Sequence, residues 1–167
     1  GGYELKQFGD SLIGFGFRRL AIIDLSPLGH QPMFSGDEQV MLMMNGEVYN
    51  YAEIRQKLIA KGHSFRSASD TEVVLKSYLE YGVEGVSQFI GMFSIVILDK
   101  SKGKFYLIRD RAGIKPLFYH EYGNGILFAS ELKAFHQHPA FEKRIDQSSL
   151  KTFFKRRMLM KCLQFIS

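Results

Sequence analysis

The sequence predicts an α+β protein in which helices cover the outer surface of an antiparallel sheet. Two patterns lead to this prediction. The first half of the chain contains two helix-like segments bounded by capping residues and glycines. The second half contains short apolar segments joined by short links, which is typical of antiparallel hairpins. Because 46% of the 167 residues are hydrophobic, the chain has enough apolar side chain for the core of one domain.

Two strands are expected before the first helix. Residues 12–25 mix alternating and β-branched apolar side chains, and residues 39–44 form an apolar run fit for a buried strand. Pro27, Gly29 and Pro32 mark the loop between them.

The first helix should span residues 51–60. Asn50 is placed as its N-cap, and Glu53 three residues later completes a capping box. Gly62 should end this helix, because glycine readily adopts the backbone conformation that follows a last helical turn.

The second helix should span residues 71–81. Ser69 and Glu72 form another capping pair, and Gly82 is the stop signal. A short helix or turn should follow over residues 83–89.

The hydrophobic period then changes to that of short strands joined by turns. Strands are expected at 91–99, 104–110, 116–120 and 125–130. A helix should begin at Glu131, and another after Asp146, which is a good N-cap residue.

The positive charge of the chain is concentrated near its C-terminal end. The formal net charge is +5, and the last 17 residues contain no acidic side chain but five basic ones, Lys151, Lys155, Arg156, Arg157 and Lys161. The rest of the chain balances 17 basic against 17 acidic side chains, so no nucleic-acid-binding face is indicated. Residues 155–167 are treated as a divergent basic tail.

Several other classes are excluded by composition. The longest apolar run, residues 92–98, is too short to cross a bilayer, so no membrane partner is expected. The single cysteine, Cys162, excludes an internal disulfide and fits a reducing compartment, which predicts a cytoplasmic protein. His136 and His138 have no neighbouring Cys or carboxylate cluster, so no metal site is expected.

Polar clusters interrupt otherwise apolar segments at three places: Arg18-Arg19, Asn45-Gly46-Glu47 and Ser69-Asp70. Asn-Gly alone is typical of a type I′ hairpin turn. Here a helix is expected soon after it, so no partner strand follows directly. The cluster alone therefore leaves two interpretations open, a plain turn or the polar end of a strand that holds a small polar ligand.

At these clusters the sequence resembles a known family, the glutamine-hydrolysing domain of asparagine synthetase, which is a class II glutamine amidotransferase of the N-terminal-nucleophile type. The resemblance covers about residues 14–150 and implies that residues 1–154 are a partial domain of this type. It implies two stacked antiparallel β-sheets flanked by helices, an αββα sandwich that lacks the family's first strand. The motifs that carry it, in order, are RRLAIIDLSPLGHQPM, NGEVYNY, SDTEVVL, GMFSIVILD and RDRAGIKPLFY.

The resemblance also implies a chemistry. In the family an N-terminal cysteine thiolate attacks the side-chain amide of glutamine, with its own α-amino group as base. The developing oxyanion needs two donors, which by the family pattern are the Asn45 side-chain amide and the Gly46 backbone N–H.

The same pattern implies how glutamine is held. Arg19 would grip the α-carboxylate of glutamine, because a guanidinium can bind it in a bidentate manner. Asp70 would bind the α-ammonium group with Glu47 as its helper. The backbone around three further residues would line the same edge: Leu20, Ile22 and Ile23.

The sequence departs from the family at both ends. The chain opens at Gly1 without the family's Met-Cys-Gly start, and Cys162 at the far end cannot replace that cysteine. The chain as given is therefore expected to be inactive alone. The resemblance fades after about Phe154, so ATP and magnesium are expected only in an absent synthetase domain, and no cofactor is expected in this chain.

The expected function is a glutaminase domain of an asparagine synthetase-like enzyme, which supplies ammonia from L-glutamine for ATP-dependent formation of asparagine from aspartate. Its expected partners are L-glutamine and the synthetase domain of the full-length chain, for which the resemblance also allows a homodimer. Two alternatives stay open. One is an amidotransferase domain that feeds ammonia to a sugar or other carboxylate acceptor. The other is a non-catalytic glutamine-binding or truncated remnant.

Overall fold

A four-stranded antiparallel sheet with the strand order β3-β4-β5-β6 organises the first of two compact units, Gly1–Lys115. The computed structural model describes residues 2–8, 11–17, 29–144 and 146–156. The strands are β3 (Met33–Phe34), β4 (Val40–Val48), β5 (Gly91–Asp99) and β6 (Lys104–Arg109).

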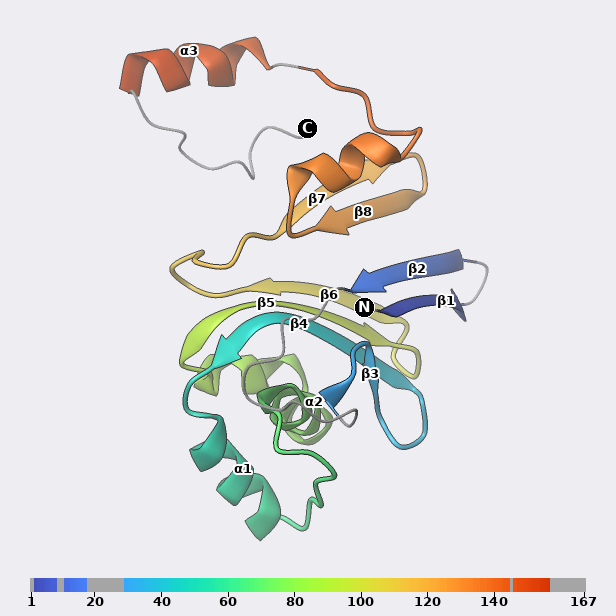
Figure 1. The fold of residues 1–167 in the computed structure, drawn as a ribbon, viewed down its shortest axis with the longest axis vertical. Coiled ribbons are helices and arrows are strands. Elements are labelled where there is room, and N and C mark those ends of the chain that lie inside the picture. Colours follow the sequence, from blue (N-terminus) through green and yellow to red (C-terminus); the bar gives the residue numbers. More distant parts are fainter. Residues whose placement is uncertain (1, 9–10, 18–28, 145, 157–167) are drawn as a thin grey trace. The chain divides into compact units, whose positions relative to one another are not determined.

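Helices cover one face of this sheet (Figure 1). They are α1 (Tyr51–Ala60) and α2 (Asp70–Tyr81), followed by the 3-10 helix η2 (Gly82–Gln88). Alternate residues of β4 and β5 pack against the helices and form the main core, because successive side chains of a strand point to opposite faces. The strand residues in this core are Val40, Leu42, Met44, Val48, Phe93, Ile95 and Ile97.

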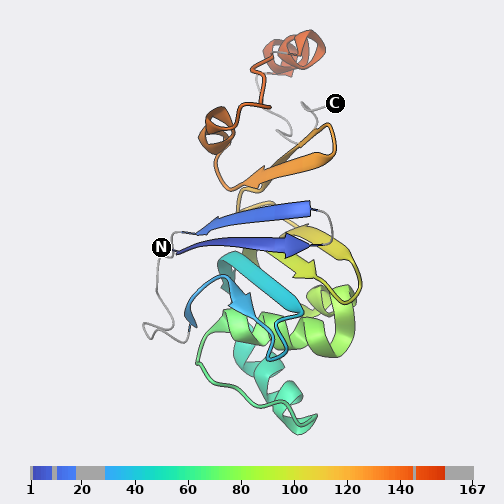
Figure 2. The ribbon, with the colours of Figure 1, turned by 90° about the vertical axis from the view of Figure 1, so that its right-hand side faces the viewer.

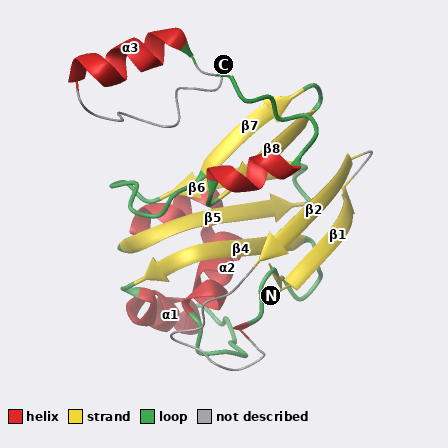
Figure 3. Ribbon diagram, turned by 45° about the horizontal axis from the view of Figure 1, so that its top comes forward, coloured by secondary structure: helices red, strands yellow, loops and turns green. Residues whose placement is uncertain are grey.

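A two-stranded antiparallel hairpin lies on the other face of the sheet (Figures 1 and 2). Its strands are β1 (Gly2–Phe8) and β2 (Ser11–Phe17). Phe15 is 1% exposed, and the Lys6 ammonium group lies 4.9 Å from the centroid of the Phe34 ring of β3. The α+β prediction with antiparallel sheets and flanking helices is thus confirmed (Figure 3), although β1 was not expected from the sequence.

The sequence predicted where the helices begin and end better than it predicted which side chains cap them. Both helices and η2 lie where the sequence placed them, and the Ser69 hydroxyl accepts the Glu72 N–H at 3.3 Å as expected. The capping box of α1 was wrong, because the Asn50 side chain makes no bond to the helix. It instead donates to the Gln88 carbonyl at 2.9 Å and accepts the Ile90 N–H at 2.9 Å.

The other half of the second capping box was also wrong. The Glu72 carboxylate accepts the backbone N–H groups of Arg66 and Ser67 and the Ser67 hydroxyl, at distances between 2.7 and 3.1 Å. Glu72 therefore stabilises the loop before α2 rather than the N-cap residue itself.

The second compact unit, Pro116–Ser167, contains the antiparallel hairpin of β7 (Phe118–Tyr122) and β8 (Gly125–Ala129). The helix expected at Glu131 is the 3-10 helix η3 (Leu132–Gln137). The ring of its Phe135 packs against the ring of Phe141, with 5.5 Å between the two ring centroids. Helix α3 (Gln147–Arg156) begins after Asp146, whose carboxylate accepts the Ser149 N–H at 2.6 Å, as predicted. The boundary expected at residue 154 stays a prediction.

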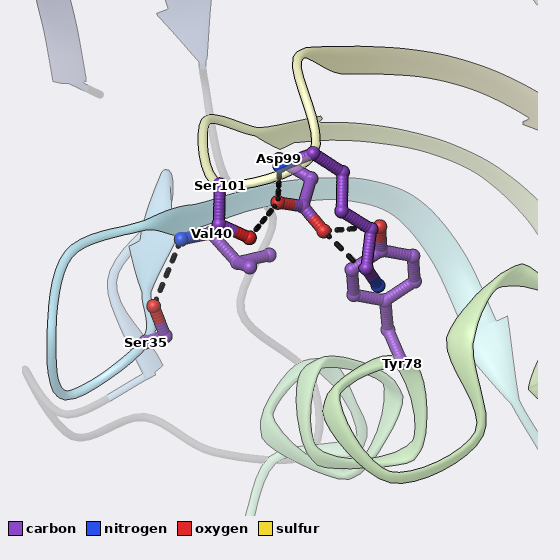
Figure 4. Close-up of polar contacts among 6 residues, drawn as sticks. Ser35, Val40, Tyr78, Asp99 and Ser101 are labelled. Atoms are coloured by element: carbon purple, nitrogen blue, oxygen red, sulfur yellow. Dashed lines mark hydrogen bonds and ion pairs between the residues drawn. The ribbon is translucent and has the colours of Figure 1, made fainter.

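A buried carboxylate anchors the β5–β6 turn to helix α2 (Figure 4). Asp99 is 1% exposed and accepts hydrogen bonds from the Ser101 hydroxyl at 2.6 Å, the Tyr78 hydroxyl at 2.7 Å and the Lys102 N–H at 3.0 Å. Burial opposes ionisation of Asp99, but these donors outweigh it and lower the pKa of the carboxyl group from 3.8 to about 2.

Asp99→Asn is expected to lower the free energy of unfolding at pH 7 by about 2 kcal/mol. A carboxyl group with a lowered folded-state pKa stabilises the protein above its ordinary pKa, and this contribution is lost as the pH falls through the folded value of about 2. Denaturant unfolding at pH 7 and at pH 2 to 4 measures the effect. The matched control is Glu38→Gln, on an exposed side chain before β4, which should unfold like the unaltered chain. A pH-independent loss would contradict the electrostatic account.

Candidate functional site

The Asn45-Gly46-Glu47 cluster lies inside β4 and not beyond its end. Asn45 pairs with Ser94 and Gly46 with Phe93, and the ladder continues to the pair of Val48 and Gly91. The strand predicted at 39–44 was therefore too short. Its extension depends on the partner strand β5, which supplies hydrogen bonds that override the local turn preference of Asn-Gly. The cluster is therefore not a hairpin turn, which was one of the two interpretations that the residues alone left open.

Gly46 occupies a backbone position that other residues do not tolerate. Its φ angle is 137°, and an added Cβ would lie 2.1 Å from the Met92 carbonyl oxygen and 2.7 Å from the Phe93 Cα. Both atoms belong to the backbone of β5, so the contact cannot be relieved by a side-chain rotation. Glycine at this position allows the two strands to approach closely.

A second glycine has the same role across the ladder. A Cβ added to Gly91 would lie 2.1 Å from the Glu47 carbonyl oxygen. No role was expected for Gly91 from the sequence, although a glycine at the first residue of an apolar strand is a usable signal for close backbone approach.

The alternation of β4 separates the cluster between the two faces of the sheet. Met44 and Val48 pack into the core under the helices, so Gly46 between them lies on the helix side. Asn45 and Glu47 consequently lie on the opposite face, which is the face that carries the β1–β2 hairpin (Figure 2). Both side chains are partly exposed.

Among the residues that the structure describes, side chains rather than a strand bind the outer edge of β4 on either side of Gly46. Strand β3 pairs only with Met41 and Leu42. Further along this edge, the Gln31 side chain accepts the Met44 N–H at 2.6 Å, and the Asp70 carboxylate accepts the Val48 N–H at 3.0 Å.

The N–H of Gly46 points to the same edge. In an antiparallel ladder the backbone groups of alternate residues point the same way, so the N–H of Gly46 follows those of Met44 and Val48. A backbone N–H at such an edge can donate to a negatively charged oxygen of a ligand.

Asp70 brings a carboxylate to this edge from the first turn of α2. Its side chain is buried, with 6% exposure. Burial raises the pKa of the Asp70 carboxyl group and the charge of Glu47 raises it further, while the Val48 N–H acts in the opposite direction. A raised pKa means that the carboxylate lacks full compensation of its charge, so a bound cation would be favoured there.

The described residues bring together four of the eight residues selected from the sequence. Asn45, Gly46 and Glu47 follow one another in β4, and Asp70 contacts the same strand two residues beyond Gly46. The other four lie outside the described residues: Arg19, Leu20, Ile22 and Ile23.

Gln31 is a buried polar residue at this site that was not among the site residues expected from the sequence, although it lies in one of the family motifs. It is 5% exposed and lies between His30 and Pro32 in a segment that was expected to be a loop. The local sequence offers no signal for this role, because the burial of a glutamine in a loop cannot be read from it.

The described residues also bear on two other possibilities, a metal-binding cluster and a membrane-spanning helix. Within residues 2–8, 11–17, 29–144 and 146–156, no group of three or more His, Cys, Asp or Glu side chains could hold a metal ion. None of the helices in these same ranges is long and apolar enough to cross a membrane.

Comparison with known proteins shows the family to which the chain is similar. Two asparagine synthetases (glutamine-hydrolyzing) of Bacillus subtilis, numbers 2 and 3, are 49% and 39% identical to the chain, over 78% and 90% of its length. The chain spans only 17% and 25% of these relatives.

A solved structure and a family model point the same way. Glutamine phosphoribosylpyrophosphate amidotransferase from B. subtilis, complexed with ADP and GMP, matches with a TM-score of 0.56 and 26% identity. The match covers 64% of this chain and 25% of that one. The model of the glutamine amidotransferase domain matches residues 3–166, so the chain belongs to the glutamine amidotransferase domain family.

Proposed function

We propose that this chain is the glutamine-binding part of a glutaminase domain that supplies ammonia from L-glutamine. Its site consists of the middle of β4 and the first turn of α2. Ammonia from the glutamine side chain would serve the ATP-dependent formation of asparagine from aspartate in a longer, asparagine synthetase-like enzyme.

In this proposal the side-chain carbonyl, the α-ammonium and the α-carboxylate of glutamine each lie against a complementary group of the protein. The carbonyl oxygen of the side-chain amide lies against the Asn45 side chain and the Gly46 N–H, and the α-ammonium group lies against Asp70 and Glu47. Arg19 holds the α-carboxylate, with the backbone around Leu20, Ile22 and Ile23 beside it.

The chemical step needs the thiolate that starts the chain in this family. Attack on the amide carbon forms a tetrahedral intermediate, whose oxyanion the two donors stabilise. The C–N bond then breaks, ammonia leaves with a proton, and water releases glutamate from the thioester. Cys162 is the single cysteine among the 167 residues. For this chain, glutamine binding is therefore a more informative test than glutamine hydrolysis.

One arrangement carries the proposal, with the direction of the Gly46 N–H inferred from the alternation of β4. The N–H of Gly46 and the carboxylate of Asp70 share one edge of β4, and Asp70 bonds to the strand only two residues from Gly46. An oxyanion donor beside a buried carboxylate suits a ligand that carries both an amide carbonyl and an ammonium group. The length of the two B. subtilis relatives supports a larger protein, because the chain spans a quarter of them or less.

Calorimetric titration of the folded chain with L-glutamine tests the proposal. We expect one molecule to bind, and we expect Asn45→Ala to weaken binding by about tenfold, which corresponds to the loss of one hydrogen bond of the carbonyl oxygen. The matched control is Asn124→Ala, in the exposed turn between β7 and β8, which should bind like the unaltered chain. No binding by a chain that melts cooperatively would contradict the proposed function.

A further inference from the structure

Gln31 connects the two elements that carry the proposed glutamine site. Its side-chain Oε1 accepts the Met44 N–H of β4 at 2.6 Å. Its Nε2 donates to the Thr71 hydroxyl at 3.2 Å, in the first turn of α2. Met44 lies two residues before Gly46, and Thr71 directly follows Asp70. One buried amide thus joins the strand that carries Gly46 to the helix that carries Asp70.

We propose that Gln31 is a positioning residue that fixes the Gly46 N–H relative to the Asp70 carboxylate, so that both can contact one glutamine molecule. This inference rests on the proposed function of the site. Gln31 itself does not contact the ligand in this account. It acts through the edge of β4 and the first turn of α2.

The bonding pattern of the β4 edge supports this role. Beyond the pairing with β3, the amides of three β4 residues point to this edge, those of Met44, Gly46 and Val48. Gln31 accepts the first and Asp70 accepts the third. The middle amide therefore has a fixed direction and position, because the strand is held by a buried side chain on each side of it.

The chemistry of the glutamine side chain matches the two contacts. The Met44 N–H needs an acceptor, which is Oε1 of Gln31. The Thr71 hydroxyl oxygen accepts a hydrogen bond from the donor Nε2 of the same side chain. An amide offers both, whereas an ionised carboxylate only accepts and an ammonium group only donates. Gln31 and Thr71 are 5% and 4% exposed, so the loss of either bond would leave a buried polar group without that partner.

The first test observes the ligand-free chain by NMR with a ¹⁵N label. We expect Gln31→Met, which keeps the size of the side chain but removes both bonds, to accelerate hydrogen exchange at the Met44 amide by about tenfold or more. The Gly46 amide resonance should shift as well. The matched control is Gln39→Met, on an exposed side chain before β4, which should leave both amides unchanged.

A second pair of variants keeps the test valid if Gln31→Met does not fold. Thr71→Val removes only the contact with Nε2, and Thr71→Ser keeps the hydroxyl group. Thr71→Val should shift the Gly46 resonance, and Thr71→Ser should restore it. Unchanged Gly46 resonances in Thr71→Val and in any folded Gln31→Met would overturn the positioning role.

Ligand titration then separates positioning from a general loss of structure. L-Norvaline has the ammonium and carboxylate groups of glutamine but lacks the side-chain amide. Thr71→Val should weaken L-glutamine binding by about tenfold and leave L-norvaline binding unchanged, so that the ratio of the two affinities falls. Equal weakening of both ligands would contradict positioning of Gly46. A chain that shows the NMR responses but binds no L-glutamine would contradict the proposed function and support the connection through Gln31.

Discussion

Gly46→Ala is expected to destabilise the chain by about 4 kcal/mol or more, which approaches the total stability of many domains. Two physical effects add at this residue. The φ angle of 137° disfavours any residue with a Cβ, and that Cβ would lie 2.1 Å from the Met92 carbonyl oxygen. Relief requires β4 and β5 to separate at the proposed glutamine site. We expect the melting temperature to fall by more than about 10 °C and L-glutamine binding to be lost.

Three other glycines separate the two effects at Gly46. An alanine at Gly91 meets a backbone oxygen at 2.1 Å without a positive φ angle, and an alanine at Gly103 has a φ angle of 61° with no atom within 4 Å. An alanine at Gly36 would have neither a positive φ angle nor an atom within 4 Å of its Cβ. The loss of stability should decrease in the order Gly46, Gly91, Gly103, Gly36. A Gly46→Ala variant as stable as Gly36→Ala would show that the close approach of the two strands is not required.

Asp70→Asn is expected to weaken L-glutamine binding by about 100-fold and at the same time to stabilise the ligand-free chain at pH 7. The binding loss follows from removal of the charge that the ammonium group would meet. The gain in stability follows from removal of a buried charge, while the asparagine carbonyl can still accept the Val48 N–H. The two changes together would be a trade-off between function and stability at one side chain.

The pH dependence gives the sign of this effect. Burial raises the folded-state pKa of Asp70 above its ordinary value of 3.8. Its contribution to stability is therefore present below pH 3.8 and is lost as the pH rises through the folded pKa. Asparagine does not titrate, so the advantage of the variant should appear as the pH rises through that range and persist at pH 7. Denaturant unfolding of both chains between pH 3 and 8 measures it.

A second carboxylate serves as a control of opposite sign. The pKa of Asp37, in the exposed turn before β4, is lowered by the Ser35 hydroxyl and the Gln39 N–H. Asp37→Asn should therefore not stabilise the chain at pH 7 and should leave L-glutamine binding intact. If Asp70→Asn destabilises the chain at pH 7 as much as Asp37→Asn does, the burial of an uncompensated charge at Asp70 is refuted.

Binding should also be linked to the protonation of Asp70. The ammonium group of glutamine would lower the pKa of the carboxyl group, so affinity should increase as the pH rises through the pKa of the free site. Proton release on binding can be measured by calorimetry in two buffers with different ionisation enthalpies. Binding without proton release near that pKa would argue against an ammonium group beside Asp70.

Elements with strong local signals could be predicted from the sequence almost residue by residue. Helix α1 spans Tyr51–Ala60 and β5 spans Gly91–Asp99, both at the predicted bounds, and α2 begins one residue earlier than predicted. Capping residues, glycine stops and hydrophobic period act within a few residues of each boundary, so the chain itself contains this information. The motifs at Asn45-Gly46-Glu47 and Asp70 likewise indicated two segments that the structure brings together at the proposed site.

Tertiary structure alone decided how those segments are held. Strand β4 extends through Asn45 and Gly46 because β5, more than forty residues away in sequence, provides the partner ladder. Gln31 binds Met44 thirteen residues on and Thr71 forty residues on, and Asp70 binds Val48 across twenty-two residues. Burial of Asp70, which raises its pKa, arises only when helix and sheet are packed. The local sequence determined which groups are present, whereas long-range packing decided which hydrogen bonds they make and how much charge the site must compensate.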